Sequence, residues 1–317
     1  MEKKKVFIAG HTGMVGRALH SRLRESMSIQ PLVVNERLDY TVDGSAEEAM
    51  ARHEPDAVVV CAAKVGGIKA NQDHPADFIY QNLAIQMNWV KAAHNKGLEK
   101  LILLNSSCVY PRDTEQPMTE EQMLTGAFEP TNQAYAMAKA AGAEMCNAYH
   151  KQYGDNFYSI VPPNLYGPYD NFRKGESHVV ASLIRKVAEV KAGKSIDVWG
   201  TGTPKREIMH VYDVARAIEF CLIQVNAKDS INGIINAGSG DEISILELAE
   251  VICSFRKRKI DINLIDGPDG MPRKIMDSGW LKMLGWSGPT VGLSEGLRDT
   301  FYWYQRNKRN SPSVLRH

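Results

Sequence analysis

Short apolar segments rich in β-branched residues recur along the first half of this chain, and helical stretches separate them. The apolar segments span residues 6–9, 32–34, 57–61, 101–105 and 158–161. The helical stretches repeat apolar residues at the period of an amphipathic helix, and the first of them holds Val15, Ala18, Leu19 and Leu23. Strands that alternate with helices in this way form parallel sheets covered on both faces. We therefore predict an α/β fold with a Rossmann-type doubly wound parallel sheet.

The character of the sequence changes beyond residue 161. Pro and Gly become frequent, and short predicted helices at 213–224 and 244–256 lie between the loops. We predict a Rossmann domain for a cofactor over residues 1–165, to which residues 207–235 return. Residues 166–317 are expected to form mainly a smaller α/β domain that binds the substrate, with a cleft between the two domains.

Charge and cysteine content exclude several classes of protein. The 317 residues include 38 Lys and Arg against 37 Asp and Glu, a balance that favours neither nucleic acid nor a membrane surface as a partner. The 5 cysteines are odd in number and form no CxxC pair, so we predict no metal site and a reducing, cytoplasmic location. The apolar run after MEKKK is too short for a signal peptide, and no segment reaches the length of a membrane span.

Three glycines stand where the first predicted strand turns into a helix. The segment VFIAGHTGMVG contains Gly10, Gly13 and Gly16. Glycine lets the backbone turn tightly and brings amide groups against a pyrophosphate, whose charge a helix N-terminus favours. A tight turn without a ligand is the alternative interpretation, and we favour a dinucleotide site.

The end of the second strand is expected to select the dinucleotide. An acidic side chain there binds the ribose hydroxyl of NAD, whereas a basic one binds the 2′-phosphate of NADP. Asn35 occupies the expected position of the acid, and Arg37 lies close by, with Glu36 between them. We predict NADP (NADPH) as the cofactor; a surface arginine without a specific role is the alternative for Arg37.

Tyr135 and Lys139 are four residues apart on a predicted helix, so both side chains project from one face. A tyrosine has a pKa of about 10, and a neighbouring ammonium lowers that pKa by favouring the phenolate. The two residues are therefore candidates for exchanging protons with a carbonyl group. The same spacing also arises by chance on surface helices, so the surrounding motifs must decide.

Those motifs resemble the extended short-chain dehydrogenases/reductases, in which a glycine turn, a strand followed by serine and a Tyr–Lys helix occur in this order. Across nearly the whole chain the sequence is similar to the GDP-L-fucose synthase family of GDP-4-keto-6-deoxy-D-mannose 3,5-epimerase-4-reductases. The shared motifs are GHTGMVG, AAKVGGIKAN, HPADFIYQN, SSCVYP, EPTNQAYAMAK, NLYGPYDNF, SHV, VWGTGTPKRE and DGMPRK.

The resemblance implies a catalytic set made of Ser106, Cys108, Tyr135, Lys139 and His178. Cys108 is implied as a base and His178 as an acid on opposite sides of the sugar, because a ketone at carbon 4 acidifies the protons on carbons 3 and 5. Tyr135 would then protonate the carbonyl oxygen, Ser106 would hydrogen-bond it and Lys139 would hold the cofactor ribose. A thiol that only packs and a histidine bonded to a loop carbonyl are the structural alternatives. Related dehydratases carry acids where this chain has Ser107 and Cys108, so elimination of water is not expected.

The resemblance also implies which residues surround the two ligands. Those around NADP are Gly10, Thr12, Gly13, Met14, Val15, Gly16, Asn35, Arg37, Asp39, Ala62, Ala63, Leu104, Asn105, Ser106, Tyr135, Lys139, Pro162, Asn164, Leu165 and His178. Those around a GDP-linked 4-keto sugar are Ser107, Cys108, Asn164, Lys186, Trp199, Arg206, Asp269 and Lys274. The basic members of the second set are expected to bind the diphosphate.

Thr12, Pro163 and Tyr169 depart from residues common in the family, and the last two leave the sugar open. The alternative function is a 4-keto reductase or epimerase of a GDP-linked dideoxyhexose or heptose, with partial or no 3,5-epimerase activity. A nucleotide-sensing regulatory protein is a further alternative, against which the Tyr–Lys pair argues. The resemblance finally implies a homodimer, in which predicted helices near 81–96 and 135–152 pair with a second copy.

Overall fold

A parallel sheet forms one half of the molecule. The structure is a computed structural model that describes residues 2–34, 38–267 and 269–308. Within these residues six parallel strands are ordered β2-β1-β3-β4-β5-β9. Their bounds are β1 Lys4–Ala9, β2 Ile29–Leu32, β3 Ala57–Val60, β4 Lys100–Leu104, β5 Phe157–Val161 and β9 Ile234–Asn236. The predicted doubly wound α/β fold is confirmed.

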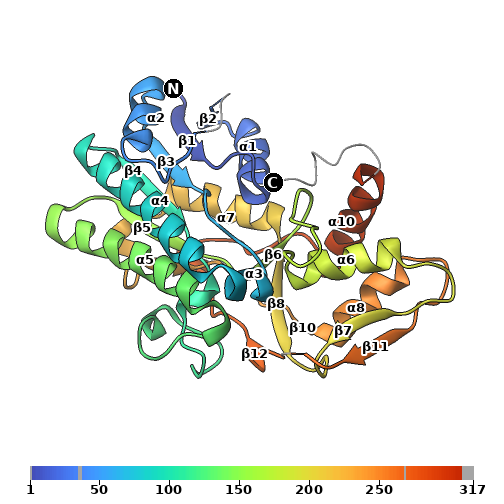
Figure 1. Ribbon diagram of the computed structural model, residues 1–317. Helices are drawn as coiled ribbons and strands as arrows, with labels where there is room; N and C mark the ends of the chain where they lie inside the picture. Colours follow the sequence, from blue (N-terminus) through green and yellow to red (C-terminus); the bar gives the residue numbers. More distant parts are fainter. Residues whose placement is uncertain (1, 35–37, 268, 309–317) are drawn as a thin grey trace.

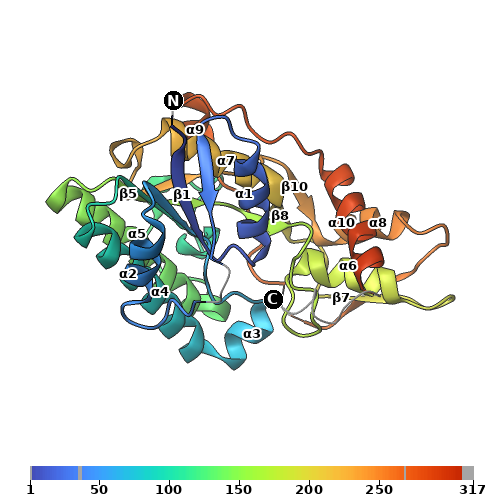
Figure 2. The same ribbon diagram turned by 90° about the horizontal axis from the view of Figure 1, so that it is seen from above.

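Helices cover both faces of this sheet, as Figures 1 and 2 show. On one face lie α1 (Met14–Arg24) and α7 (Val211–Gln224), and on the other lie α2 (Ser45–His53), α4 (Pro75–Asn95) and α5 (Gln133–Tyr153). Alternate residues of β1 point to opposite faces. Val6 and Ile8 join the core under α1 and α7, and Phe7 and Ala9 join the core under α2 and α4.

The second strand was predicted at residues 32–34, and this placement was wrong. The strand runs from Ile29 to Leu32 and, among the strands of the described residues, pairs only with β1, with Lys4 opposite Ile29 and Phe7 opposite Leu32. The strand includes Pro31. Because β2 is an edge strand, a proline that lacks an N–H group can be accommodated there.

The other half of the molecule is built from short strands and three helices (Figure 1). Strand β8 (Lys205–His210) pairs with β6 (Asn164–Tyr166), β10 (Glu242–Ser244) and β12 (Arg273–Lys274), and β7 (Ile196–Trp199) pairs with β11 (Ile262–Ile265). Helices α6 (Val179–Glu189), α8 (Ile245–Ser254) and α10 (Leu293–Asn307) enclose a separate apolar core around Ile184, Leu248, Leu297 and Phe301.

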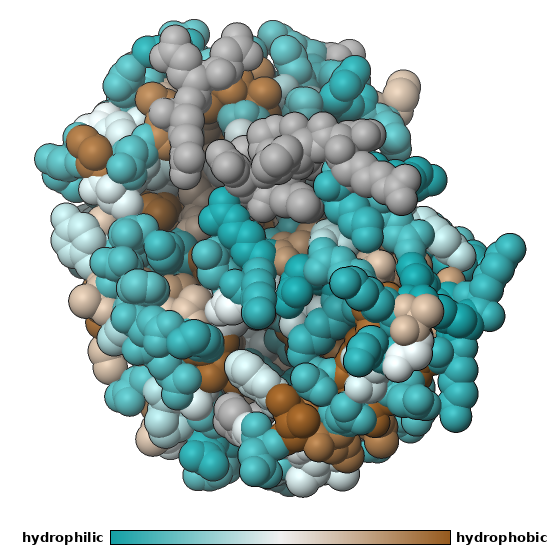
Figure 3. Space-filling view, turned by 45° about the vertical axis from the view of Figure 1, so that its right-hand side comes forward, coloured by the Kyte–Doolittle hydropathy of each residue, from teal (hydrophilic) through white to brown (hydrophobic). Residues whose placement is uncertain are grey.

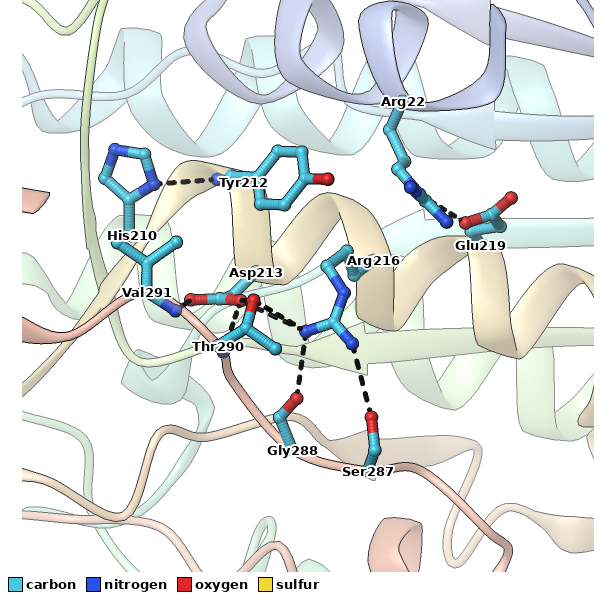
Figure 4. Close-up of polar contacts among 10 residues, drawn as sticks. All are labelled: Arg22, His210, Tyr212, Asp213, Arg216, Glu219, Ser287, Gly288, Thr290 and Val291. Carbon is cyan, nitrogen blue, oxygen red and sulfur yellow. Dashed lines mark hydrogen bonds and ion pairs between the residues drawn. The ribbon is translucent and has the colours of Figure 1, made fainter. Parts of the chain in front are cut away.

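Helix α7 ties the two halves together through polar contacts drawn in Figure 4. The buried carboxylate of Asp213 accepts hydrogen bonds from the backbone N–H of Thr290 (2.8 Å) and of Val291 (3.1 Å). One turn away, Arg216 donates to the carbonyl of Gly288 at 3.1 Å. These contacts fix the segment that leads into α10 against the helix covering the parallel sheet.

The remaining helical elements are short and belong to connecting segments. They are α3 (Ile68–Asp73), α9 (Gly279–Met283) and the 3-10 turns η1 (Ser107–Val109), η2 (Glu120–Gln122), η3 (Pro130–Asn132) and η4 (Ala227–Asp229). Turn η1 follows the end of β4, and turn η3 precedes the start of α5. Both contribute to the site described next. Within the described ranges, no helix combines the length and apolar character that crossing a bilayer would require.

Candidate active site

The three glycines of the first turn play different parts. Gly10 has a φ of 86°, and a Cβ there would lie 2.5 Å from the backbone nitrogen of Ala62. A Cβ on Gly16 would press against the carbonyl oxygen of Gly10. Packing within the chain therefore accounts for both glycines. Gly13 is different, because its Cβ would meet the Gly10 oxygen at an ordinary 3.5 Å.

Gly13 is also the N-cap residue of α1, and no side chain among the described residues caps this helix. The first turn, with Met14 and Val15, thus presents its backbone N–H groups without a capping side chain. Arg17 closes the turn from the side by donating to the carbonyl oxygen of Thr12 at 2.8 Å. This arrangement fits the pyrophosphate of a dinucleotide, for which a helix N-terminus and a close backbone approach are suited.

The residues predicted to select the dinucleotide are described only in part. Asn35 and Arg37 lie outside the described residues, so the predicted preference for a 2′-phosphate stays a prediction. Asp39 is described, and its Oδ1 accepts hydrogen bonds from the backbone N–H (3.0 Å) and hydroxyl (2.7 Å) of Thr41. Ala62 and Ala63 follow β3 and are half-buried beside the glycine turn.

Polar contacts join the end of β4 to helix α5. The Lys139 ammonium donates to the carbonyl oxygen of Leu104 at 2.8 Å, and the Asn105 side-chain amide donates to the carbonyl of Lys139 at 3.1 Å. Asn105 also accepts from the backbone N–H of Ser106 at 2.9 Å. The strand end and the helix that carries Tyr135 are therefore held in one position relative to each other.

Tyr135 lies near both Ser106 and Lys139. The Lys139 Nζ is 5.9 Å from the centre of the Tyr135 ring, and the Ser106 side chain lies close enough to the Tyr135 hydroxyl to act on its pKa. The expected lowering of the Tyr135 pKa is wrong for this structure. Burial raises the pKa of Tyr135, and a negative charge on Cys108 would raise it further. Burial also lowers the pKa of Lys139 to about 8, which weakens the cation that was expected to oppose it.

Cys108 lies in η1 and is half-buried, and its sulfur lies close to two donors. The Asn132 side-chain amide nitrogen lies 3.0 Å from the sulfur, and the Lys274 Nζ lies 3.5 Å from it. The backbone N–H of Cys108 donates to the Ser106 hydroxyl at 3.3 Å, which fixes the turn. Both side chains are hydrogen-bond donors. Sequence reasoning missed Asn132, although the residue lies in the motif EPTNQAYAMAK.

His178 is the N-cap residue of α6 and lies close enough to Lys274 for the charge of that lysine to act on it. Its side chain is accessible to solvent, yet the surrounding protein desolvates it and lowers its pKa, and the charge of Lys274 lowers the pKa further. The loop before it is held from the other half of the molecule, since the backbone N–H of Gly67 donates to the carbonyl of Glu176 at 2.8 Å. Lys274 therefore contacts Cys108 and also acts electrostatically on His178.

A small hollow beside these groups is lined by Ser107, Pro163, Asn164, Glu207, Lys274 and Met276. Ser107 donates its backbone N–H to the carbonyl of Pro162 at 3.3 Å, which connects η1 to the start of β6. The side chain of Leu165 packs instead against the core of the parallel sheet. Figure 3 shows a face of the molecule that is largely hydrophilic around a central hollow.

The predicted diphosphate-binding residues are distributed over the second half. Arg206 lies directly opposite Lys274 in the pairing of β8 with β12, and its guanidinium donates to the carbonyl of Asp269 at 3.1 Å. Lys186 donates to the carbonyl of Asp197 in β7 at 2.6 Å. The last residue of that strand, Trp199, is 50% exposed. Burial lowers the pKa of both cations, Arg206 and Lys186.

Asp269 has a structural partner as well. Its carboxylate accepts the backbone N–H of Thr201 at 2.8 Å and so joins the turn after β7 to the segment before β12. Across the described residues, no group of three or more His, Cys, Asp or Glu side chains is arranged to hold a metal ion.

Comparison with known proteins identifies relatives over the full length. Residues 6–238 match the model of the NAD dependent epimerase/dehydratase family. The chain is 43% identical over 310 residues to a GDP-L-fucose synthase of Sinorhizobium fredii, covering 97% of each chain. It is 40% identical over 318 residues to the GDP-L-fucose synthase of Escherichia coli, covering 97% of this chain and 98% of the other.

A solved structure adds a bound ligand to the comparison. A GDP-mannoheptose C4 reductase from Campylobacter jejuni with NADP bound superposes with a TM-score of 0.85 at 29% identity, covering 96% of this chain and 99% of that one. The resemblance inferred from the motifs is therefore confirmed by both sequence and fold.

Proposed function

Because the chain belongs to the NAD dependent epimerase/dehydratase family, and within it to the GDP-L-fucose synthases, we propose that it converts a GDP-4-keto-6-deoxy sugar in two steps. The first step is epimerisation at carbons 3 and 5, and the second is NADPH-dependent reduction at carbon 4. The arrangement that carries this proposal is the sulfur of Cys108 in contact with Asn132 and Lys274, two residues after Ser106 and near Tyr135.

The cofactor is NADPH, which supplies the hydride for reduction when it is bound. Residues 1–165 with 207–235 are proposed to bind it, with the pyrophosphate at the uncapped start of α1 and Gly13 leaving room for close approach. The C. jejuni relative solved with NADP supports this choice. Lys139, with its Nζ at the carbonyl of Leu104, is proposed to hold the ribose.

Epimerisation requires a base and an acid on opposite sides of the ring. The ketone at carbon 4 acidifies the neighbouring C–H groups, and Cys108 is proposed to take the proton as a thiolate while His178 returns one to the other face. Lys274 contributes in two ways. Its charge stabilises the thiolate, and by lowering the pKa of His178 it makes the protonated imidazole a stronger acid.

Reduction requires a proton donor at the carbonyl oxygen. Burial raises the pKa of Tyr135, so the phenol keeps its proton at neutral pH until the oxygen of the substrate gains negative charge. Ser106 lies close enough to the Tyr135 hydroxyl to act on its pKa and is proposed to hydrogen-bond the same substrate oxygen. Because a Cys108 thiolate also raises the Tyr135 pKa, the base for the first step keeps the acid for the second step protonated.

Residues 166–317 are proposed to bind the nucleotide sugar. Arg206, Lys186 and Lys274 offer cations to the diphosphate, and the half-exposed ring of Trp199 offers a surface for the nucleobase, with Asp269 nearby. Asn164 and Ser107 line the hollow and are proposed to contact the sugar.

A second candidate function is the reduction or epimerisation of a related GDP-linked dideoxyhexose or heptose, with partial or no 3,5-epimerase activity. The similarity to a GDP-mannoheptose C4 reductase favours it. Tyr169 also favours it, because this residue departs from the family pattern. Tyr169 has a φ of 68°, and the guanidinium carbon of Arg17 lies 4.6 Å from the centre of its ring. A panel of GDP-linked 4-keto hexoses and heptoses, assayed with NADPH and NADH in heavy water, separates the two functions. Deuterium at carbons 3 and 5 supports the first, and reduction without deuterium supports the second.

We also propose a homodimer in a reducing, cytoplasmic compartment. Helices α4 and α5 pack side by side and expose Tyr80, Met87, Met137 and Tyr153. All five cysteines are free, which suits a reducing compartment. Sedimentation equilibrium is expected to give twice the chain mass, and Met137→Glu is expected to give the monomer.

A further inference from the structure

Asn132 has an unusual side-chain orientation for its position in the chain. It is the N-cap residue of α5, and an asparagine there ordinarily accepts a hydrogen bond from the N–H of the second or third helical residue. The Asn132 side chain makes no such bond. Instead its amide nitrogen lies 3.0 Å from the sulfur of Cys108. The Asn132 side chain therefore contacts this thiol and does not cap the start of α5.

The surroundings of Asn132 reinforce this orientation. Among the described residues, its buried side-chain oxygen has no hydrogen-bond partner, so the contact with the sulfur is the polar bond that the side chain makes. The turn that carries Asn132 is itself fixed, because the Glu129 side chain accepts the backbone N–H of Thr131 and caps η3. The backbone just before Asn132 is thus fixed where its side chain contacts Cys108.

An amide N–H donor distinguishes the two protonation states of the sulfur. A thiolate is a strong acceptor, whereas a neutral thiol is a weak one, so the Asn132 contact stabilises the charged form more than the neutral form. The Lys274 ammonium at 3.5 Å is a second donor, from a segment more than 140 residues away. The Ser106 hydroxyl, which accepts the backbone N–H of Cys108, fixes the direction of the Cα–Cβ bond.

We propose that Asn132 is a positioning residue for epimerisation, which donates a hydrogen bond to the Cys108 thiolate and holds it against the ring carbon. The inference deepens the proposed function and rests on it. In the step concerned, the ring C–H bond breaks and an S–H bond forms. The electron pair of the C–H bond moves onto the carbonyl oxygen as an enolate, and a proton from His178 then forms the new C–H bond on the opposite face.

This role also connects the two reactions. Asn132 and Tyr135 are three residues apart at the start of α5. The same helix end therefore positions the residue that supports the base of the epimerisation and the tyrosine that acts as the acid of the reduction. A change at Asn132 is expected to affect the first reaction while leaving the second intact, since Tyr135 and Lys139 are held by their own contacts with Ser106 and Leu104.

The test uses the full chain with NADPH bound and compares Asn132→Ala, Asn132→Asp and the control Gln133→Ala. Gln133 is the next residue, and its side chain is exposed. Three quantities are measured: the rate of Cys108 alkylation by iodoacetamide against pH, deuterium entry at carbons 3 and 5, and NADPH oxidation with ketone that has already been epimerised.

For Asn132→Ala we expect alkylation at pH 7 and deuterium entry both to fall roughly tenfold, the effect of losing one charge-assisted hydrogen bond. For Asn132→Asp the loss is expected to be larger, because a carboxylate repels the thiolate. Reduction of the epimerised ketone stays at the level of Gln133→Ala in both variants, which shows that the fold is intact.

Alkylation and deuterium entry at the control rate in Asn132→Asp would overturn the inference, and so would faster alkylation in Asn132→Ala. Cys108→Ser separates this failure from failure of the proposed function. If deuterium entry survives in Cys108→Ser, the base assignment itself is wrong. If it is lost there and retained in the Asn132 variants, only the role of Asn132 is wrong.

Discussion

The Nζ of Lys274 lies 3.5 Å from the Sγ of Cys108, although 166 residues separate them in the chain. The same lysine lowers the pKa of His178. One cation therefore acts on both of the groups proposed to invert the sugar. The ammonium already lies against the sulfur in the unbound protein.

Replacing Lys274 with methionine is expected to slow epimerisation more than reduction. Loss of a charge-assisted contact of this kind amounts to roughly 1.5–3 kcal/mol, which corresponds to a fall in the exchange rate of at least tenfold. The pKa of His178 is expected to rise, because the charge that lowers it is removed. Deuterium entry and titration of His178 by NMR check the two effects.

Lys205→Met serves as the control for Lys274→Met. Lys205 is also a lysine in the β8–β12 pairing, but its ammonium contacts Glu242 at the surface. Its replacement is expected to leave both reactions unchanged. If Lys274→Met lowers exchange and reduction by the same factor, Lys274 acts only in substrate binding.

Gly67→Ala is expected to impair epimerisation through the loop that carries His178. A Cβ on Gly67 would lie 2.7 Å from the carbonyl oxygen of Ser177, so that residue must move. We expect deuterium entry to fall by an order of magnitude, while reduction of an epimerised ketone by the Tyr135 set continues. Equal loss of both activities would contradict this local explanation.

Gly13→Ala and Gly16→Ala are expected to separate cofactor binding from folding. Gly13 has an extended backbone and room for a methyl group, so alanine there is expected to keep or slightly raise the free energy of unfolding without cofactor, by up to about 1 kcal/mol. It is also expected to weaken NADPH binding at least tenfold, because the methyl group occupies the space for the pyrophosphate.

Gly16→Ala is expected to lower the free energy of unfolding, since its Cβ would meet the backbone of Gly10 and His11. Urea unfolding and fluorescence titration with NADPH measure these quantities. Unimpaired NADPH binding by Gly13→Ala would contradict the proposed site.

Lys139 is expected to make stability depend on pH. Its pKa is about 8 in the folded chain, against 10.5 ordinarily. Between these values the unfolded chain binds more protons, so stability rises as the pH is raised from 8 to 10.5, and the burial penalty is complete below pH 8. Lys139→Met removes this penalty and is expected to increase the free energy of unfolding at pH 7 by about 1–3 kcal/mol, after loss of the bond to Leu104.

Urea unfolding of the cofactor-free protein at pH 7 and pH 10 checks this prediction. The gain in Lys139→Met is expected at pH 7 and is expected to shrink at pH 10. A variant that is less stable than the parent at pH 7 would show that the Leu104 contact outweighs the desolvation of the ammonium. Reductase activity is expected to be lost in either case.

Much of the fold could be predicted because it follows from local periodicity. The strands that hold Val6–Ala9 and Leu101–Leu104 are buried on both faces and read as continuous apolar runs, and the glycine turn lies directly after the first of them. The edge strand β2 was misplaced, because its position is set by pairing with β1 and not by its own composition.

The site was predictable only as a set of residue types. Cys108, Tyr135 and Lys274 were identified from motifs, but the contacts among them depend on how η1, the start of α5 and β12 pack together. Asn132 was missed for this reason, since its partner lies 24 residues away in another turn. The direction of the Tyr135 pKa was wrong because burial, a tertiary property, outweighs the nearby ammonium.

The most direct test of the central claim is deuterium entry from heavy water into carbons 3 and 5 of the GDP-linked 4-keto sugar, followed by NMR without NADPH. The parent protein is expected to introduce deuterium at both carbons, and Cys108→Ser is expected to introduce none while still reducing an epimerised ketone when NADPH is added. Exchange at the parent rate in Cys108→Ser would contradict the claim that this thiolate, supported by Asn132 and Lys274, is the base.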